Sequence, residues 1–107
     1  MPELIKVATL DQLPPGRMLY VDVDGLPIAV ANVDGTIYAF GDSCRHEGGS
    51  LSSGVLRDEV VTCPLHGWAY NVRSGKSVIP PVGLRLPRYA VSVRGRDVLL
   101  EVEWETS

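Results

Sequence analysis

Cysteine and histidine are scarce in this sequence, and their scarcity limits what the protein can be. Two cysteines in 107 residues are too few for the disulfide framework of a small secreted scaffold, which leaves metal binding, redox chemistry or simple burial as their roles. Basic residues are not in excess either. Ten Lys and Arg against thirteen Asp and Glu give a formal net charge of -3, which argues against a nucleic-acid binder.

Long apolar runs and an export signal are also missing. No stretch of about 18 apolar residues could cross a bilayer, so we expect a cytoplasmic protein without a membrane anchor. The hydrophobic fraction of 45% is that of an ordinary globular protein, and the length suffices for one core but not for two. We therefore predict a single domain over residues 1–107.

Short alternating segments between turn residues predict a β structure. Apolar and polar residues alternate over residues 18–40, and the breaks fall at the Asp-Gly dipeptides 24–25 and 34–35, which favour tight hairpin turns. This pattern predicts a three-stranded meander. Pro27 cannot donate a backbone hydrogen bond, so we expect it at a strand start, an edge or a bulge.

The other expected elements are short. Thr9 can cap a helical turn, and Gln12 can return the bond to it. Short strands are expected at 60–63 and 69–72, and a terminal hairpin at 89–93 and 98–104, in which Val98, Leu100, Val102 and Trp104 share one face. Many short strands with little helix favour an all-β antiparallel sandwich or barrel.

Both cysteines and both histidines stand in two short pairs. The pairs are Cys44-Arg45-His46 and Cys63-Pro64-Leu65-His66, with sixteen residues between His46 and Cys63. Glycine, serine and charged residues surround the first pair, which places it in a loop. Thiolate and imidazole bind soft and borderline transition metals, so two loops carrying these pairs can close over one metal centre.

Three interpretations compete for this set of side chains. The cysteines can be small buried side chains or a disulfide with incidental histidines. A structural zinc site is the second, but its usual ligand order is a cysteine pair followed by a histidine pair. The third is a 2Fe-2S cluster in which cysteines hold one iron and histidines the other. The alternating Cys-His order favours the third interpretation.

The two pairs and their neighbours closely resemble the motif of Rieske ferredoxins, which is Cys-x-His followed by Cys-x-x-His. The resemblance continues in Leu51-Ser52-x-Gly54, in Thr62, in Gly67-Trp68 and in Tyr70-Asn71-x-x-x-Gly75, and so covers most of the chain. It implies a Rieske-type antiparallel β-sandwich or barrel, with cluster-binding loops at about 42–72 inserted in the β base as a small subdomain at one tip.

The resemblance also implies a role for each ligand. Cys44 and Cys63 would hold the inner iron of one 2Fe-2S cluster, and His46 and His66 the outer iron. Neutral imidazole in place of charged thiolate makes such a cluster accept an electron more readily, with potentials of about -150 to +300 mV.

Residues around the expected cluster indicate the type of Rieske protein. Quinol-oxidising members carry an extra cysteine in each loop, and Gly49 and Leu65 stand in those places here. They also place a serine and a tyrosine that hydrogen-bond the cluster sulfurs. Trp68 replaces that serine, whereas Tyr70 keeps the tyrosine, so we expect a potential in the lower part of the range but not at its floor.

Further residues near the ligands have two possible roles each. Trp68 can shield the cluster or only pack beside it. Gly48 and Gly49 can let backbone N–H groups approach the cluster or only supply turns. Pro81, after Pro80, resembles a third loop that packs over the cluster, and otherwise is a rigid connector.

The resemblance predicts a soluble electron carrier. It would pass single electrons from a flavin-containing ferredoxin reductase to the terminal oxygenase of an aromatic ring-hydroxylating dioxygenase system, as a monomer with transient interfaces. It would not be an enzyme alone, because no Gly-x-Gly-x-x-Gly dinucleotide motif is present. The alternatives are a docked component similar to the small subunit of nitrite reductase, and a zinc-stabilised binding module.

Overall fold

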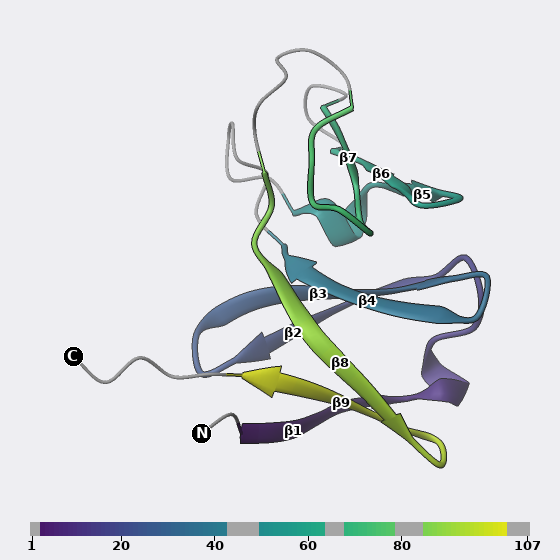
Figure 1. Cartoon of the computed structure of the whole chain (residues 1–107), viewed down its shortest axis with the longest axis vertical. Helices are drawn as coiled ribbons and strands as arrows, with labels where there is room; N and C mark the ends of the chain where they lie inside the picture. The colour runs from purple at the N-terminus through teal and green to yellow at the C-terminus, as the bar shows by residue number, and fades with distance from the viewer. Residues whose placement is uncertain (1–2, 43–49, 64–67, 79–84, 103–107) are drawn as a thin grey trace.

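Two antiparallel sheets make up the computed structural model, which describes residues 3–42, 50–63, 68–78 and 85–102. The three-stranded sheet stands on one side of the six-stranded sheet, and β1 and β9 lie on the side away from it (Figure 1). In spatial order the large sheet consists of β1 (Glu3–Thr9), β9 (Asp97–Val102), β8 (Arg88–Arg94), β4 (Thr36–Gly41), β3 (Leu26–Val33) and β2 (Met18–Val23). The small sheet consists of β5 (Val55–Arg57), β6 (Val60–Thr62) and β7 (Ala69–Asn71). The predicted all-β antiparallel architecture is confirmed.

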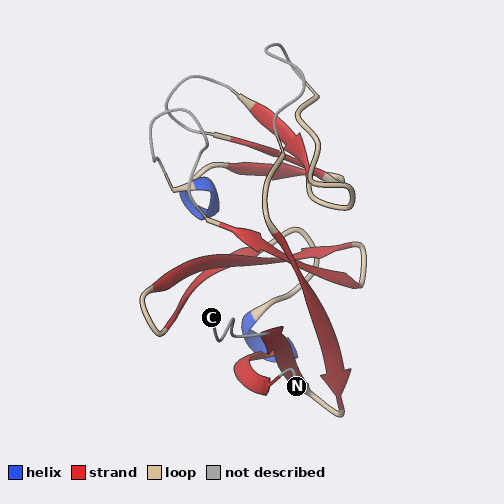
Figure 2. Ribbon diagram, turned by 60° about the vertical axis from the view of Figure 1, so that its left-hand side comes forward, coloured by secondary structure: helices blue, strands red, loops and turns tan. Residues whose placement is uncertain are grey.

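The chain enters and leaves the small sheet from neighbouring strands of the large one. The segment between β4 and β8 contains β5, β6 and β7, and β4 pairs with β8 through Ala39 with Tyr89 and Phe40 with Arg88. Figure 2 shows that most of the described structure consists of strands and that the helical segments are short. No helix in the described parts of the chain is long and apolar enough to cross a membrane.

The predicted meander is confirmed, and both of its turns follow from their sequences. Asp24 and Gly25 have φ of 55° and 85°, and Asp34 and Gly35 have φ of 52° and 97°. Positive φ at both central residues defines the hairpin turn that Asp-Gly favours, because glycine and aspartate tolerate this conformation. Pro27 is the second residue of β3, at the strand start where it was expected.

Each of the two turns contains the same kind of side-chain hydrogen bond, but the residue that accepts it is buried in only one of them. The sequences Asp22-Val23-Asp24-Gly25 and Asn32-Val33-Asp34-Gly35 place an Oδ1 acceptor for the glycine N–H, at 2.7 Å in each case. Asn32 is buried and its Nδ2 also donates to Leu13 O at 2.8 Å. Asn32 therefore joins the β3–β4 turn to the loop after the first helical turn.

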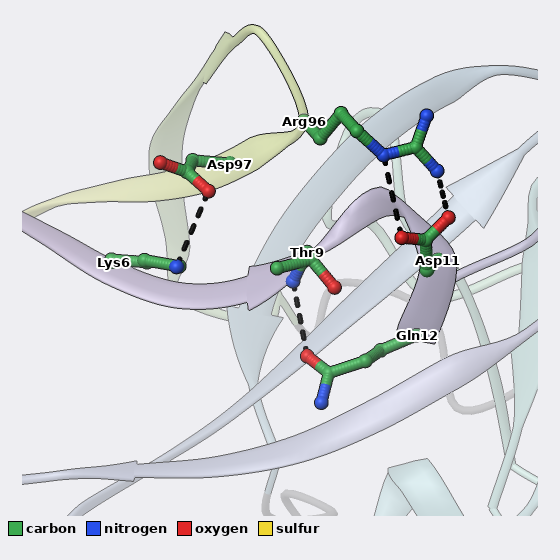
Figure 3. A network of polar contacts seen from close by, with 6 residues as sticks. All are labelled: Lys6, Thr9, Asp11, Gln12, Arg96 and Asp97. Atoms are coloured by element: carbon green, nitrogen blue, oxygen red, sulfur yellow. Dashed lines mark hydrogen bonds and ion pairs between the residues drawn. The ribbon is translucent and has the colours of Figure 1, made fainter.

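That helical turn is the one predicted from Thr9 and Gln12. It is the 3-10 helix η1 (Leu10–Gln12), and Thr9 N–H donates to Gln12 Oε1 at 3.0 Å. Arg96 in the β8–β9 turn pairs with Asp11 of η1, and Lys6 lies 3.3 Å from Asp97 (Figure 3). These ion pairs are exposed, so each contributes about 0 to 1 kcal/mol to stability.

Two strands were not foreseen. β1 pairs with β9, and the register of this pairing shifts between Lys6 and Ala8. The shift breaks the alternation of apolar and polar residues by which a strand is predicted from sequence. β5 has only three residues, and it pairs with β6. The terminal hairpin was predicted correctly as β8 and β9, with Val98, Leu100 and Val102 buried, whereas Trp104 lies outside the described residues.

Both faces of β3 are buried, so this strand separates two cores. Ile28 and Val30 point into the core of the large sheet, while Ala29 and Ala31 face the small sheet. The core of the large sheet contains Leu13, Val23, Ile28, Val30, Ala39, Leu100 and Val102. The core between the sheets, called here the inter-sheet core, contains Ala29, Ala31, Phe40, Leu51, Val61, Cys63, Tyr70, Val72 and Leu86.

Replacing Asn32 with alanine tests how much this buried side chain contributes. We expect Asn32→Ala to lower the free energy of unfolding by about 2 kcal/mol, because the buried Leu13 carbonyl loses its donor. Asp22→Ala removes the same turn bond at an exposed site and should cost about 0.5 kcal/mol or less. Urea unfolding monitored by circular dichroism measures both, and equal losses would contradict this account.

Candidate metal centre

Cys63 is the predicted ligand that the structure describes, and it lies in the inter-sheet core. It follows β6 directly, and 1% of its surface is exposed. Its N–H donates to Trp68 O at 2.6 Å. This bond fixes both ends of segment 64–67, which contains His66 in the sequence.

The residues on either side of the segment with the other predicted ligands are joined in the same way. Asp42 follows β4, and its carbonyl accepts a hydrogen bond from Leu51 N–H at 2.8 Å. Segment 43–49, with Cys44 and His46, lies between these residues in the sequence. Leu51 begins the 3-10 helix η2 (Leu51–Ser53) and is fully buried in the inter-sheet core together with Cys63.

The backbone after the first segment lies close to the backbone before the second, at Gly54 and Thr62. A Cβ added at Gly54 would collide with the backbone oxygen of Thr62. Glycine is therefore required here for space. The turn after η2 is therefore pressed against the residue that precedes Cys63.

Two further predicted residues, Tyr70 and Trp68, lie beside Cys63. Tyr70 is fully buried in the inter-sheet core, including its hydroxyl, and pairs with Val61 across β6 and β7. Trp68 is partly buried and packs against the same core. The structure therefore brings Cys63, Trp68 and Tyr70 together, and gives Trp68 at least the packing role expected of it.

The third predicted loop also begins and ends next to this core. Val78 N–H donates to Ala69 O at 2.9 Å, and Leu86 N–H donates to Gly75 O at 2.8 Å. Leu86 is a member of the inter-sheet core. Thus Val78, just before segment 79–84, is bonded to β7, and Leu86, shortly after that segment, belongs to the inter-sheet core.

Several predicted site residues lie outside the described residues, so their roles remain predictions. They are Cys44, His46, Gly48, Gly49, His66 and Pro81. Within the ranges that the structure describes, no three His, Cys, Asp or Glu side chains gather as a metal site. Among the described residues, Cys63 and the bonded residues on either side of the two segments are the features that support a metal centre.

The residues present fit a 2Fe-2S cluster. A thiolate is the preferred ligand of iron–sulfur clusters, and Cys63 is buried in an apolar core, where solvent is excluded. The chain holds two cysteines and two histidines, which is the ligand set that a cluster with mixed cysteine and histidine ligation requires.

Asp42 is a residue of this region that the sequence reasoning missed. Its side chain is buried and accepts hydrogen bonds from Ser50 and Ser52. The available signal was an aspartate just after a predicted strand and two residues before Cys44, since aspartate side chains commonly bond nearby backbone N–H groups in loops.

Comparison with known proteins gives a consistent family. Residues 3–90 match the Rieske [2Fe-2S] domain. The ferredoxin component of biphenyl 2,3-dioxygenase from Rhodococcus jostii (strain RHA1) is 39% identical over 100 residues, which cover 94% of this chain and 94% of that protein.

Solved structures share the fold. A chain in the complex of reduced oxygenase and oxidized ferredoxin in carbazole 1,9a-dioxygenase is 33% identical, with a TM-score of 0.88 and coverage of 97% of both chains. A structure assigned to the small subunit of an NADH-dependent nitrite reductase from Mycobacterium tuberculosis has a TM-score of 0.87 over 98% of this chain and 99% of that one. Its identity is 21%, so this likeness concerns the fold alone.

The contact between Gly54 and Thr62 predicts a steric effect. We expect Gly54→Ala to lower the free energy of unfolding by about 3 kcal/mol or more, because its Cβ collides with a backbone oxygen. Gly16→Ala is a control with φ of 87° but no atom within 4 Å of the new Cβ, and should cost about 1 kcal/mol. Chemical denaturation of both variants measures the difference. A Gly54→Ala protein as stable as Gly16→Ala would contradict the close approach.

Proposed function

The chain belongs to the Rieske [2Fe-2S] domain family, and on this basis we propose that it carries single electrons from a flavin-containing ferredoxin reductase to a terminal oxygenase. The observation that supports the proposal most is Cys63, buried in the inter-sheet core at the start of the segment that contains His66. The relative from Rhodococcus jostii, similar over nearly its whole length, is a ferredoxin component.

We propose that four side chains hold the cluster. Cys44 and Cys63 bind one iron, and His46 and His66 bind the other. When bound, the 2Fe-2S cluster supplies a site that gains and loses one electron. The chain has no other cysteine or histidine, so the full set is used by the cluster. The protein is therefore an electron-transfer component and not itself an oxygenase.

Partners and location follow from the same proposal. The chain acts as a monomer in the cytoplasm, and its contacts with reductase and oxygenase are small and transient. The solved carbazole 1,9a-dioxygenase complex, which contains a ferredoxin and an oxygenase, supports the oxygenase as one partner. Exchange between two partners requires rapid release, and a small interface suits this need.

The alternatives are weaker. A docked component like the small subunit of nitrite reductase has support from the fold only. A zinc-stabilised binding module does not agree with membership of a family whose domain holds a 2Fe-2S cluster. A freely exchanging carrier is monomeric in gel filtration and supports turnover only when both partners are present, whereas a docked subunit co-purifies with one enzyme.

Visible absorption and the EPR spectrum of the reduced protein test the ligand assignment. We expect Cys63→Ala to lose the visible bands and the EPR signal, because one iron loses a thiolate. Val61→Ala truncates a buried neighbour in the same core and should keep both signals while losing about 2 kcal/mol of stability. A wild-type protein that is colourless and contains zinc without iron would overturn the proposed function.

The midpoint potential tests the role of Tyr70. A hydrogen bond from its buried hydroxyl to a cluster sulfur stabilises the electron-rich reduced state, so Tyr70→Phe should lower the potential by about 40 mV, equivalent to ~1 kcal/mol. Tyr38→Phe, on β4 and packed against the same core, should leave the potential unchanged. Protein-film voltammetry measures both variants, and an unchanged potential in Tyr70→Phe would exclude this bond.

A further inference from the structure

The buried side chain of Asp42 accepts hydrogen bonds from two residues of one loop. Asp42 is 2% exposed, and no other charged residue in the described part of the chain is buried. Its Oδ2 accepts from Ser50 Oγ at 2.6 Å, and its Oδ1 accepts from Ser52 N–H at 2.7 Å. A buried carboxylate is costly unless it is hydrogen-bonded, and these two bonds offset that cost. An apolar side chain at this position could not form them, so the carboxylate holds residues 50 and 52 in a way that apolar packing would not.

The backbone of Asp42 fixes this residue to the large sheet. Its N–H donates to Pro27 O at 3.1 Å, at the start of β3, and its carbonyl accepts from Leu51 N–H at 2.8 Å. Asp42 is thus attached to a central strand on one side and to residues 50–52 on the other. We call the bonds of Asp42 to Ser50, Leu51 and Ser52 the loop clamp.

The loop clamp holds the ends of segment 43–49, in which Cys44 and His46 lie. Two of the residues bonded to Asp42 belong to η2, which begins with Leu51, and Leu51 packs in the inter-sheet core with Cys63. Gly54, directly after η2, is pressed against Thr62, the residue before Cys63. A continuous set of contacts therefore leads from Asp42 to the start of the second ligand segment.

We propose that Asp42 is a positioning residue for the metal centre. Through the loop clamp it sets where Cys44 and His46 stand relative to Cys63, and so sets the geometry of the cluster and the rate at which the cluster is lost. This inference rests on the proposed function, because it assumes that these side chains bind the cluster. The role depends on hydrogen bonds and not on the charge of the carboxylate.

The hydrogen bonds make different substitutions distinguishable. Asp42→Ala removes both side-chain bonds of the clamp, and Ser50→Ala removes one. Asp42→Asn keeps them, because its Oδ1 can accept from Ser52 N–H while its amide donates to Ser50 Oγ. Asn32→Ala is the matched control, since it removes two side-chain bonds of a buried residue that is not part of the clamp.

EPR g-values of the reduced protein and the rate of cluster loss to an iron chelator are the two readouts, taken well below each variant's unfolding temperature. We expect Asp42→Ala to shift the g-values and to lose the cluster about tenfold faster or more, as for other residues that orient metal ligands. Ser50→Ala should change both in the same direction by less. Asp42→Asn should have the g-values and the cluster-loss rate of the wild type. Asn32→Ala should also have wild-type g-values and loss rate, although it melts at a lower temperature.

Several outcomes would overturn the inference. Wild-type g-values and loss rate in Asp42→Ala, or equal changes in Asn32→Ala, would show that Asp42 contributes only general stability. Should Asp42→Ala not fold, Ser50→Ala decides in the same way, and unchanged readouts in that variant overturn the proposal. A wild-type protein without any 2Fe-2S signal would overturn the proposed function as well, which separates the two failures.

Discussion

Packing of the small sheet against one face of β3 and β4 is the interaction on which the metal centre depends. Ala29 and Ala31 contribute short side chains to this face, and Phe40, which pairs with Ala29 across β3 and β4, lies beside them. Cys63 is buried in the same core. Because hydrophobic burial drives this packing, the free energy that folds the protein also places Cys63, the proposed cluster ligand.

Short hydrogen bonds at the ends of each segment complete the arrangement. Leu51 bonds to Asp42, Cys63 to Trp68 and Val78 to Ala69, all through backbone atoms next to strands. The segments with the proposed ligands thus begin and end at residues held by backbone hydrogen bonds, which is the arrangement that precise metal binding requires. A carrier that changes redox state many times benefits from ligands that move little between states.

Local chemistry explains what the sequence could predict. The hairpins at Asp24-Gly25 and Asp34-Gly35 depend on turn residues that are visible in the sequence, and ligand types in a fixed order indicated the cluster family. β1 could not be predicted, because its partner β9 is distant in sequence and its own alternation is broken. The need for glycine at position 54 arises from the nearby Thr62 carbonyl, a tertiary contact that the sequence does not reveal, and the roles of Cys44, His46 and His66 remain predictions.

The central claim is that the folded core presents a cluster held by two cysteines and two histidines. Pulsed EPR of the reduced protein, prepared with ¹⁵N-labelled histidine, tests this claim most directly, because a strong coupling to a nitrogen nucleus requires a bond to iron. Our account predicts strong couplings from two histidine nitrogens, and predicts that His46→Ala and His66→Ala disturb them. A cluster signal without strong ¹⁵N coupling would contradict it.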